Sequence, residues 1–277
     1  LIPFKLISSI KETKAKLKEV SPDIIFSKGG FVAVPVAMAG KKLNIPIISH
    51  ESDLTFGLAN KIILKSCTVM CTSFQATAKK NKKCVYTGQP IRQKIFEGQD
   101  LRLFKNNLPC MLVLGGSLGA KFLNEIIFDN LDKLTKKYNI IHITGKKNFQ
   151  NIIHENYKIV SYAENIEDYY KTADIVVARA GSGVINELLA LAKPMLLIPL
   201  SKSCSRGDQI DNAKLFEKQE YAQVLQEEEY TFEKFSMKLD FITKFHEKIE
   251  KNMKKTAKNN AVEKICLIIN DNIKKQN

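Results

Sequence analysis

Short apolar runs alternate with longer helical patterns along most of this 277-residue chain. Within the runs nearly every residue is apolar, whereas the stretches between them carry apolar residues three or four positions apart. Uninterrupted apolar runs are typical of strands covered on both faces, and their alternation with helices is typical of βαβ units around a parallel sheet. The predicted strands lie at 24–26, 47–49, 68–71, 84–86, 111–114, 140–144, 158–161, 175–178 and 195–199.

A polar segment divides these strands into two groups. Pro90 follows Gly88, and residues 89–108 carry only scattered apolar positions, which indicates a connection between lobes. We therefore predict an α/β protein with two Rossmann-like lobes, at 1–93 and 94–277, each built on its own sheet. The tail from Phe232 onward reads as Lys-rich helices and is assigned to the second lobe.

Composition limits the class of protein. A hydrophobic content of 44% and a charged content of 26% predict a globular chain with a substantial core. The net charge of +14 predicts attraction to polyanions, but the lysines are spread along the chain without interleaved aromatics, so nucleic acid is not an expected partner. Six cysteines without CxxC or zinc-ligand spacing indicate reduced thiols in a cytoplasmic protein. No apolar run approaches the roughly 20 residues of a membrane span, so any membrane contact is expected to be peripheral.

Three times a predicted strand runs into a Gly-rich turn and then a helix. The segments are IIFSKGGFVAVPVAMAG, MLVLGGSLGAKFLNEII and IVVARAGSGVINELLALAKP. Such turns place free backbone N–H groups and helix N-termini at the carboxyl edge of a sheet, where phosphate binds. Each turn alone is better explained by tight packing, but three together favour a ligand held between the lobes.

Two common nucleotide motifs do not fit these turns. The chain has no GxxxxGK[ST] motif, which argues against a P-loop NTPase. GGSLGA lacks the GxGxxG spacing, and no acidic residue ends the following strand, so NAD binding is disfavoured. In the third turn, Glu187 lies near the start of a helix, where its carboxylate either accepts ribose hydroxyls or simply favours the helix dipole.

Six segments occur in an order and spacing similar to the MurG family of glycosyltransferases, which add N-acetylglucosamine to the undecaprenyl-diphosphate-linked muramoyl-pentapeptide of peptidoglycan. The similarity extends from Phe4 to Gln219, and the segments are SKGGFVAVPVAMAG, HESDLTFGLANK, TGQPIR, LGGSLGAKFLN, ARAGSGVINELLALAKPMLLIPL and SRGDQIDNAKLFEKQ. The resemblance implies a GT-B fold whose second lobe holds UDP-N-acetylglucosamine and whose first lobe holds the lipid acceptor. It also implies a hexosyltransferase of cell-wall biogenesis, and so a link to cell shape and division, at the cytoplasmic face of the membrane.

The resemblance assigns a role in donor binding to several positions. Ser117 would bond the diphosphate and Arg92 would approach it, Ala163 would offer its backbone to the uracil, and Glu187 would hold the ribose. Gln209 would bind the sugar hydroxyls. The full set expected on the donor side is Arg92, Ser117, Asn124, Ala163, Arg179, Ser182, Gly183, Val184, Ile185, Asn186, Glu187 and Gln209. We expect Ser117, Glu187 and Gln209 to converge on one cavity.

On the acceptor side, His50 and Glu51 are the candidate catalytic residues, and Asp53 and Asn60 are candidate acceptor contacts. A His-Glu pair after a strand can instead cap the next helix, and Asp53 stands where other branches of the family carry Asn. The expected reaction is an inverting displacement in which an acceptor hydroxyl attacks the anomeric carbon while UDP leaves. No DxD-like motif lies near the turns, so this interpretation requires no metal and no cofactor.

Two further expectations concern the start of the chain. Leu1 is not an initiator Met and no GGTGGH-like loop precedes the first helix, so we expect a first lobe that is incomplete at its N-terminus and either a truncated sequence or an inactive form. Phe4, Ile7 and Ile10 lie on one helical stripe beside lysines, which predicts either a membrane patch for anionic lipid or packing on the sheet.

Two alternatives to this function stay open. One is another GT-B transferase that acts on a lipid acceptor. The other is a non-catalytic fragment that binds a nucleotide sugar or a polyanion.

Overall fold

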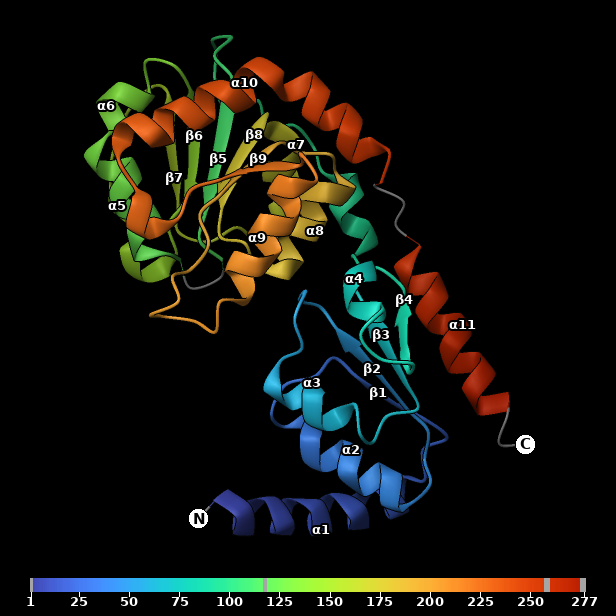
Figure 1. Ribbon diagram of the computed structural model, residues 1–277. Helices are drawn as coiled ribbons and strands as arrows, with labels where there is room; N and C mark the ends of the chain where they lie inside the picture. The colour runs from blue at the N-terminus through green and yellow to red at the C-terminus, as the bar shows by residue number, and fades with distance from the viewer. Residues whose placement is uncertain (1, 117–118, 257–259, 275–277) are drawn as a thin grey trace. The chain divides into compact units, whose positions relative to one another are not determined.

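The computed structural model describes residues 2–116, 119–256 and 260–274, and the chain forms two compact units. Unit 1 comprises Leu1–Pro90 and Asn259–Asn277, and unit 2 comprises Ile91–Lys258. Each unit contains its own sheet, and all the paired strands run parallel (Figure 1). The predicted fold class, α/β with two Rossmann-like lobes, is confirmed.

Unit 1 is built around a four-stranded sheet of order β1-β2-β3-β4. Strands that are consecutive in the chain are also neighbours in this sheet, so each crossover connection moves the chain one strand along. The elements are α1 (Ile2–Val20), β1 (Ile25–Ser27), α2 (Ala33–Lys42), β2 (Ile47–Glu51), α3 (Leu58–Ile63), β3 (Val69–Thr72), α4 (Gln75–Ala78), β4 (Cys84–Tyr86) and α11 (Ala261–Lys274).

The sheet of unit 1 is covered on both faces. Successive strand residues point to opposite faces, so Ile47 packs into a cluster with α1, α2 and α3, while the next residue, Ile48, packs with Cys71 and Ile265 of α11. The two clusters account for the apolar residues that these strands carry on both faces. The last helix of the chain therefore supplies the second layer of unit 1.

The position of α11 differs from the expected division of the chain. The sequence analysis assigned the whole tail to the second lobe, at 94–277, whereas α11 groups with unit 1. The physical reason is the apolar stripe through Ile265, Ile268 and Ile269, which packs on β2 and β3. The boundary between the units at Pro90 and Ile91 lies close to the expected one at 93.

Unit 2 is built around a six-stranded sheet of order β10-β9-β8-β5-β6-β7. From the central strand β5 the chain first moves outward to β6 and β7, and then returns to β8 on the other side of β5. Its elements are η1 (Gln93–Glu97), β5 (Cys110–Leu114), α5 (Lys121–Asp129), α6 (Leu131–Leu134), β6 (Asn139–Ile143), η2 (Lys146–Asn148), β7 (Tyr157–Val160), α7 (Ile166–Thr172), β8 (Ile175–Ala178), α8 (Ser182–Ala190), β9 (Met195–Leu197), α9 (Asp208–Lys218), β10 (Ala222–Val224), η3 (Glu227–Glu229) and α10 (Phe232–Lys254).

The strand order of unit 2 creates a switch point between β5 and β8. The connections that leave these two neighbouring strands run to opposite sides of the sheet, so a crevice opens at their carboxyl ends, and ligands bind there in doubly wound sheets. The core of the unit is the sheet itself, in which every residue of β5, β6, β8 and β9 is buried.

All nine predicted strands are confirmed, and their ends agree to within two residues. The tenth, β10, was missed because only Ala222 and Val224 are apolar in this three-residue strand and helix α9 ends shortly before it. In the part of the chain that the structure describes, no helix combines the length and hydropathy needed to cross a bilayer.

Replacing Ile265 by Ala tests whether α11 is an integral layer of unit 1. Ile265 is buried against Ile48 and Cys71, so we expect the variant to lose about 2–4 kcal/mol of stability. Leu267→Ala, which truncates a side chain of the same helix that is 55% exposed, is the control and should change stability by less than about 0.5 kcal/mol. Denaturant unfolding with hydrogen exchange of the β2 amides measures both. Equal effects of the two variants would contradict the packing of α11.

Candidate functional site

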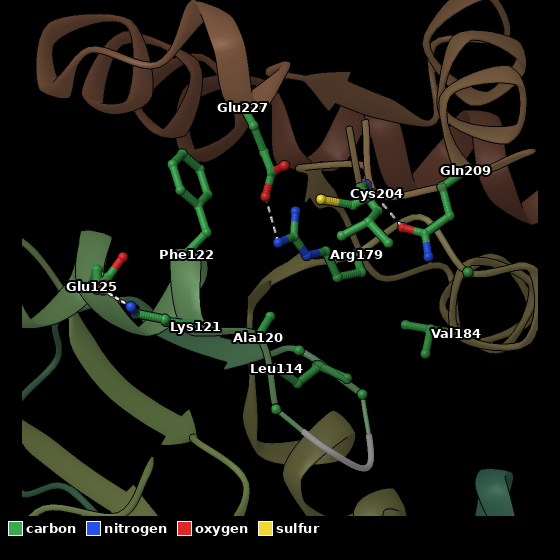
Figure 2. A pocket seen from close by; sticks show the side chains of 15 residues that line it. Leu114, Ala120, Lys121, Phe122, Glu125, Arg179, Val184, Cys204, Gln209 and Glu227 are labelled. Atoms are coloured by element: carbon green, nitrogen blue, oxygen red, sulfur yellow. Dashed lines mark hydrogen bonds and ion pairs between the residues drawn. The ribbon is translucent and has the colours of Figure 1, made fainter. Parts of the chain in front are cut away.

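A cavity of about 750 Å³ lies in unit 2 at the carboxyl ends of four strands (Figure 2). Its walls come from the segments that follow β5, β8, β9 and β10, so it occupies the switch point of the sheet. The lining residues are Leu114, Gly115, Gly116, Gly119, Ala120, Lys121, Phe122, Glu125, Arg179, Gly181, Val184, Leu200, Cys204, Gln209 and Glu227.

The turn between β5 and α5 forms one wall and depends on glycine. Gly116 and Gly119 have φ values of +82° and +77°, which L side chains rarely adopt. A Cβ atom on Gly119 would also clash with the carbonyl oxygen of Thr144. Glycine at 119 therefore lets the backbone pack closely on Thr144, whereas a Cβ atom on Gly116 would meet nothing within 4 Å. Ser117, which was expected to bond a diphosphate, lies outside the described residues.

Two helices begin at the cavity without a side-chain cap. The N-cap of α5 is Ala120 and the N-cap of α8 is Gly181, and neither accepts a hydrogen bond through its side chain. The first N–H groups of a helix have no partner within the helix and carry the positive end of its dipole. Both helix ends therefore favour an anion in the cavity.

The predicted residues of α8 divide between the cavity and the core. Val184 lines the cavity, and Gly183 is exposed. Ser182, Ile185 and Asn186 are buried, and the Asn186 amide donates to the Ser182 carbonyl oxygen at 2.8 Å. These three shape the helix that forms the wall.

An ion pair lies at the edge of the cavity. Arg179 Nη2 is 2.5 Å from Glu227 Oε1, and Arg179 Nη1 donates to the carbonyl oxygen of Ile198 at 3.0 Å. The Arg179 guanidinium also lies 6.0 Å from the ring centre of Phe122. Arg179, predicted as a substrate-binding residue, thus lies at the cavity but is already engaged by the protein (Figure 2).

Gln209 sits in the first turn of α9, and its orientation is fixed by one hydrogen bond. The backbone N–H of Leu200 donates to Gln209 Oε1 at 3.1 Å. Because that contact requires the oxygen, the Nε2 end of the amide is turned away from Leu200 and can donate to a ligand (Figure 2). Gln209 lines the cavity, and its contact with a sugar stays a prediction.

Glu187 does not line the cavity, so its expected convergence with Gln209 is not observed. Its Oε2 accepts a hydrogen bond from the buried Tyr170 hydroxyl at 3.1 Å. Burial raises the pKa of the Glu187 carboxyl, while the Tyr170 hydroxyl and the charge of Arg92 act in the opposite direction. Glu187 and Arg92 are thus electrostatic neighbours. Ala163 lies in the loop that follows β7.

Asn124 is buried within unit 2 and does not reach the cavity. Its Nδ2 donates to the Thr144 carbonyl oxygen at 3.0 Å, and its Oδ1 lies 3.0 Å from Nε2 of the buried His142. Since Thr144 also packs against Gly119, Asn124 supports the β5–α5 turn from behind.

In unit 1, His50 is fully buried at the end of β2 and both of its ring nitrogens have partners. Nε2 donates to the Gly88 carbonyl oxygen at 3.1 Å, and Nδ1 lies 3.2 Å from Lys28 Nζ and 3.3 Å from Ser52 Oγ. Burial, with a smaller contribution from the Lys28 charge, lowers the pKa of His50 to about 4. His50 is therefore neutral near pH 7.

Glu51 and Asn60 form a buried network beside His50. Glu51 accepts hydrogen bonds from the backbone of Asp53 at 3.1 Å and of Gly57 at 3.0 Å, and from Asn60 Nδ2 at 3.0 Å. Asn60 Nδ2 also contacts the His50 carbonyl oxygen at 3.2 Å. The network holds residues 52–57, and Asp53 lies half-buried in that loop.

The predicted stripe on α1 is divided between surface and interior. Ile7 is 65% exposed, whereas Ile10 is 9% exposed and therefore faces inward. The two residues do not share an exposed face, which corrects the sequence-based stripe. The side chain of Phe4 lies outside the described residues.

Four polar cavity residues were not predicted from the sequence, namely Lys121, Glu125, Cys204 and Glu227. Glu227 reaches Arg179 across 48 positions of the chain, and Cys204 is exposed in the loop between β9 and α9. Glu227 lies in a run of three acidic residues, a pattern that usually indicates a solvated surface. The only signal was its place just after the last strand of the sheet, and that strand was itself missed.

Comparison with sequence families gives two matches that together span both units. The Glycosyltransferase family 28 C-terminal domain matches residues 110–266, and the Glycosyltransferase family 28 N-terminal domain matches residues 1–72. The first of these contains every residue that lines the cavity.

Individual proteins are also similar over nearly the whole chain. A UDP-N-acetylglucosamine--N-acetylmuramyl-(pentapeptide) pyrophosphoryl-undecaprenol N-acetylglucosamine transferase of Clostridium tetani is 46% identical, over 96% of this chain and 77% of the relative. The transferase of the same name from Clostridium novyi is 45% identical, over 96% and 78%. Among solved structures, MurG of Acinetobacter baumannii has a TM-score of 0.77 at 24% identity, covering 97% of this chain and 80% of that chain.

The buried state of His50 predicts a pH dependence of stability. Because its pKa is lower in the folded state than in the unfolded chain, its contribution is complete above about pH 6.5 and is lost as the pH falls toward 4. Between pH 7 and pH 5 we expect His50 to account for a loss of about 2 kcal/mol.

Denaturant unfolding at both pH values tests this contribution. The His50→Gln variant should lose less stability than the wild type over this interval, whereas His246→Gln, at an exposed position, should lose as much. An unchanged pH dependence in His50→Gln would contradict the burial of a neutral His50.

Proposed function

Because the chain belongs to glycosyltransferase family 28, we propose that it transfers N-acetylglucosamine from UDP-N-acetylglucosamine to the undecaprenyl-diphosphate-linked muramoyl-pentapeptide of peptidoglycan synthesis. The names of the clostridial relatives support both substrates. The observation that carries the proposal is the cavity at the switch point of unit 2, where a glycine turn and two uncapped helix N-termini meet.

The chemistry of the cavity suits a reaction that releases a nucleoside diphosphate. In an inverting displacement, an acceptor hydroxyl attacks the anomeric carbon and negative charge develops on the departing diphosphate. Helix N-termini and backbone N–H groups stabilise such charge without reorganisation. The N-termini of α5 and α8 are the groups that we assign to this role, and the open turn at Gly116 and Gly119 lets the diphosphate approach the backbone.

We assign the sugar and the nucleoside of the donor to different residues. Gln209 would bond the sugar hydroxyls through its Nε2, because its oxygen is held by Leu200. Glu187 would accept the ribose hydroxyls, with Tyr170 orienting the carboxylate and Arg92 nearby. Ala163 would then lie at the uracil. This assignment places the nucleoside outside the cavity proper, toward the end of β7.

For the acceptor, the proposed roles of His50 and Glu51 are positional. A general base must reach the hydroxyl that it deprotonates, but His50 is fully buried with both nitrogens engaged, and Glu51 is used by backbone N–H groups and by Asn60. We assign them to holding the loop at 52–57, in which Asp53 would face the acceptor.

We further propose that the protein is peripheral to the cytoplasmic face of the membrane. The net charge of +14 favours an anionic surface. On α1 the exposed Ile7 lies one turn from the exposed Lys11, which is the combination of an apolar side chain and a basic rim that favours an interface.

Donor binding is tested by calorimetry with UDP. We expect the wild type to bind UDP and not ADP, and Gly119→Ala to weaken UDP binding at least roughly tenfold, because its Cβ would displace the turn. Gly40→Ala is the matched control, since its Cβ would clash with Ile25 in unit 1, away from the cavity. It should lower stability but leave UDP binding within about twofold. A wild-type chain that does not bind UDP would refute the proposed function.

Membrane binding is tested by flotation with vesicles that contain anionic lipid. Ile7→Ser should reduce the bound fraction several-fold, because it removes exposed apolar area. Val20→Ser alters a residue of similar exposure, 61%, at the other end of the same helix and should bind as the wild type does. Undiminished binding of Ile7→Ser would remove this helix from the membrane contact.

A further inference from the structure

Glu227 is a largely buried carboxylate in a cavity where two helix N-termini favour an anion. Glu227 lines the cavity together with the turn after β5 and with Gly181, the N-cap of α8. Its side chain is 15% exposed, and that of its partner Arg179 is 12% exposed. A negative charge in this position would repel a diphosphate unless a cation neutralised it, and Arg179 is the cation paired with Glu227.

Both oxygens of Glu227 have a specific donor. Oε1 is 2.5 Å from Arg179 Nη2, and Oε2 accepts from the backbone N–H of Ser201 at 3.2 Å. Arg179 in turn donates through Nη1 to the carbonyl oxygens of Ile198, at 3.0 Å, and Pro199, at 3.4 Å. The pair therefore joins the carboxyl ends of β8, β9 and β10.

The segment held in this way orients Gln209, the sugar-binding residue of the proposed site, which lies in α9. Ser201 directly follows Leu200, whose N–H fixes the oxygen of Gln209. The same segment is tied internally, because Ser205 Oγ donates to the Ser201 carbonyl oxygen at 2.9 Å. A shift of Ser201 would therefore move Leu200 and change the direction in which the Gln209 amide points.

The pair also sets the charge of the cavity. Because Arg179 is neutralised by Glu227 and donates to two carbonyl oxygens, its charge is not available to a ligand. Attraction for the diphosphate is then left to the helix N-termini and to Lys121, which is itself 3.6 Å from Glu125 Oε1, and these groups hold a product less tightly than a free guanidinium would. Release of UDP is part of every turnover.

We propose that Glu227 is a positioning residue for donor recognition: it holds Arg179 away from the diphosphate and fixes the Leu200–Ser201 backbone that orients Gln209. The inference rests on the proposed function, since it takes the cavity to bind a UDP-sugar. Glu227 would thus strengthen the binding of the sugar and weaken the binding of the diphosphate.

Replacing Glu227 by Gln tests this assignment, because an amide offers one acceptor oxygen to the two donors that the carboxylate now satisfies. With Arg179 released, UDP should bind roughly three to ten times more tightly. UDP-N-acetylglucosamine should not share this gain, so the ratio of its Kd to that of UDP should rise at least about threefold. Glu228→Gln, an exposed neighbour in the same short helix, makes the same charge change and should leave both Kd values near those of the wild type.

A second pair of variants keeps the test decisive if Glu227→Gln is poorly folded. Arg179→Met leaves the Glu227 carboxylate unpaired at the cavity, so UDP binding should weaken at least about tenfold. Adding Glu227→Gln to Arg179→Met should restore most of that loss, which is a coupling that two independent structural defects would not produce.

The outcomes distinguish a failure of the proposed function from a failure of the role proposed for Glu227. If the wild type fails to bind UDP, the proposed function fails. If the wild type binds UDP but Glu227→Gln weakens UDP and UDP-N-acetylglucosamine equally, Glu227 has only a structural role and the inference is overturned. Behaviour of Glu227→Gln that matches Glu228→Gln would overturn it as well.

Discussion

The reversal of strand order between β5 and β8 is the constraint on which the site depends. Chains leaving two adjacent parallel strands toward opposite faces cannot fill the space above the strand ends, and the helices that follow start at that space. In this protein α5 and α8 start there without side-chain caps. The groups after β9 and β10 then close the same space from one side, and these include Gln209 and Glu227.

Much of the fold could be predicted from the sequence because strands buried on both faces consist largely of consecutive apolar residues. The strand β5, with every residue buried, is apolar throughout, and this run of apolar residues predicts it directly. The short edge strand β10 needs no such composition and was missed. The apolar stripe of α11 predicts that the helix packs, but periodicity does not say on which sheet, so its place in unit 1 required coordinates.

The candidate site was predictable only where the backbone dictates residue type. The turn through Gly119 needs glycine because of its φ value and the nearby Thr144 carbonyl oxygen, and its pattern was recognised. The roles of side chains whose partners are distant in the sequence could not be predicted in this way. His50 was a candidate for chemistry by residue type, yet Gly88 and Lys28 occupy its nitrogens. Glu227 reaches Arg179 from 48 residues away.

The packing of α11 on β2 and β3 has a consequence for how the chain is made. Synthesis proceeds from the N-terminus, so the sheet of unit 1 leaves the ribosome about 170 residues before the helix that covers its second face. Throughout that interval Ile48 and its neighbours are open to solvent or to chaperones, while unit 2, which is continuous in sequence, can close independently. Maturation of unit 1 is thereby delayed until α11 has been synthesised.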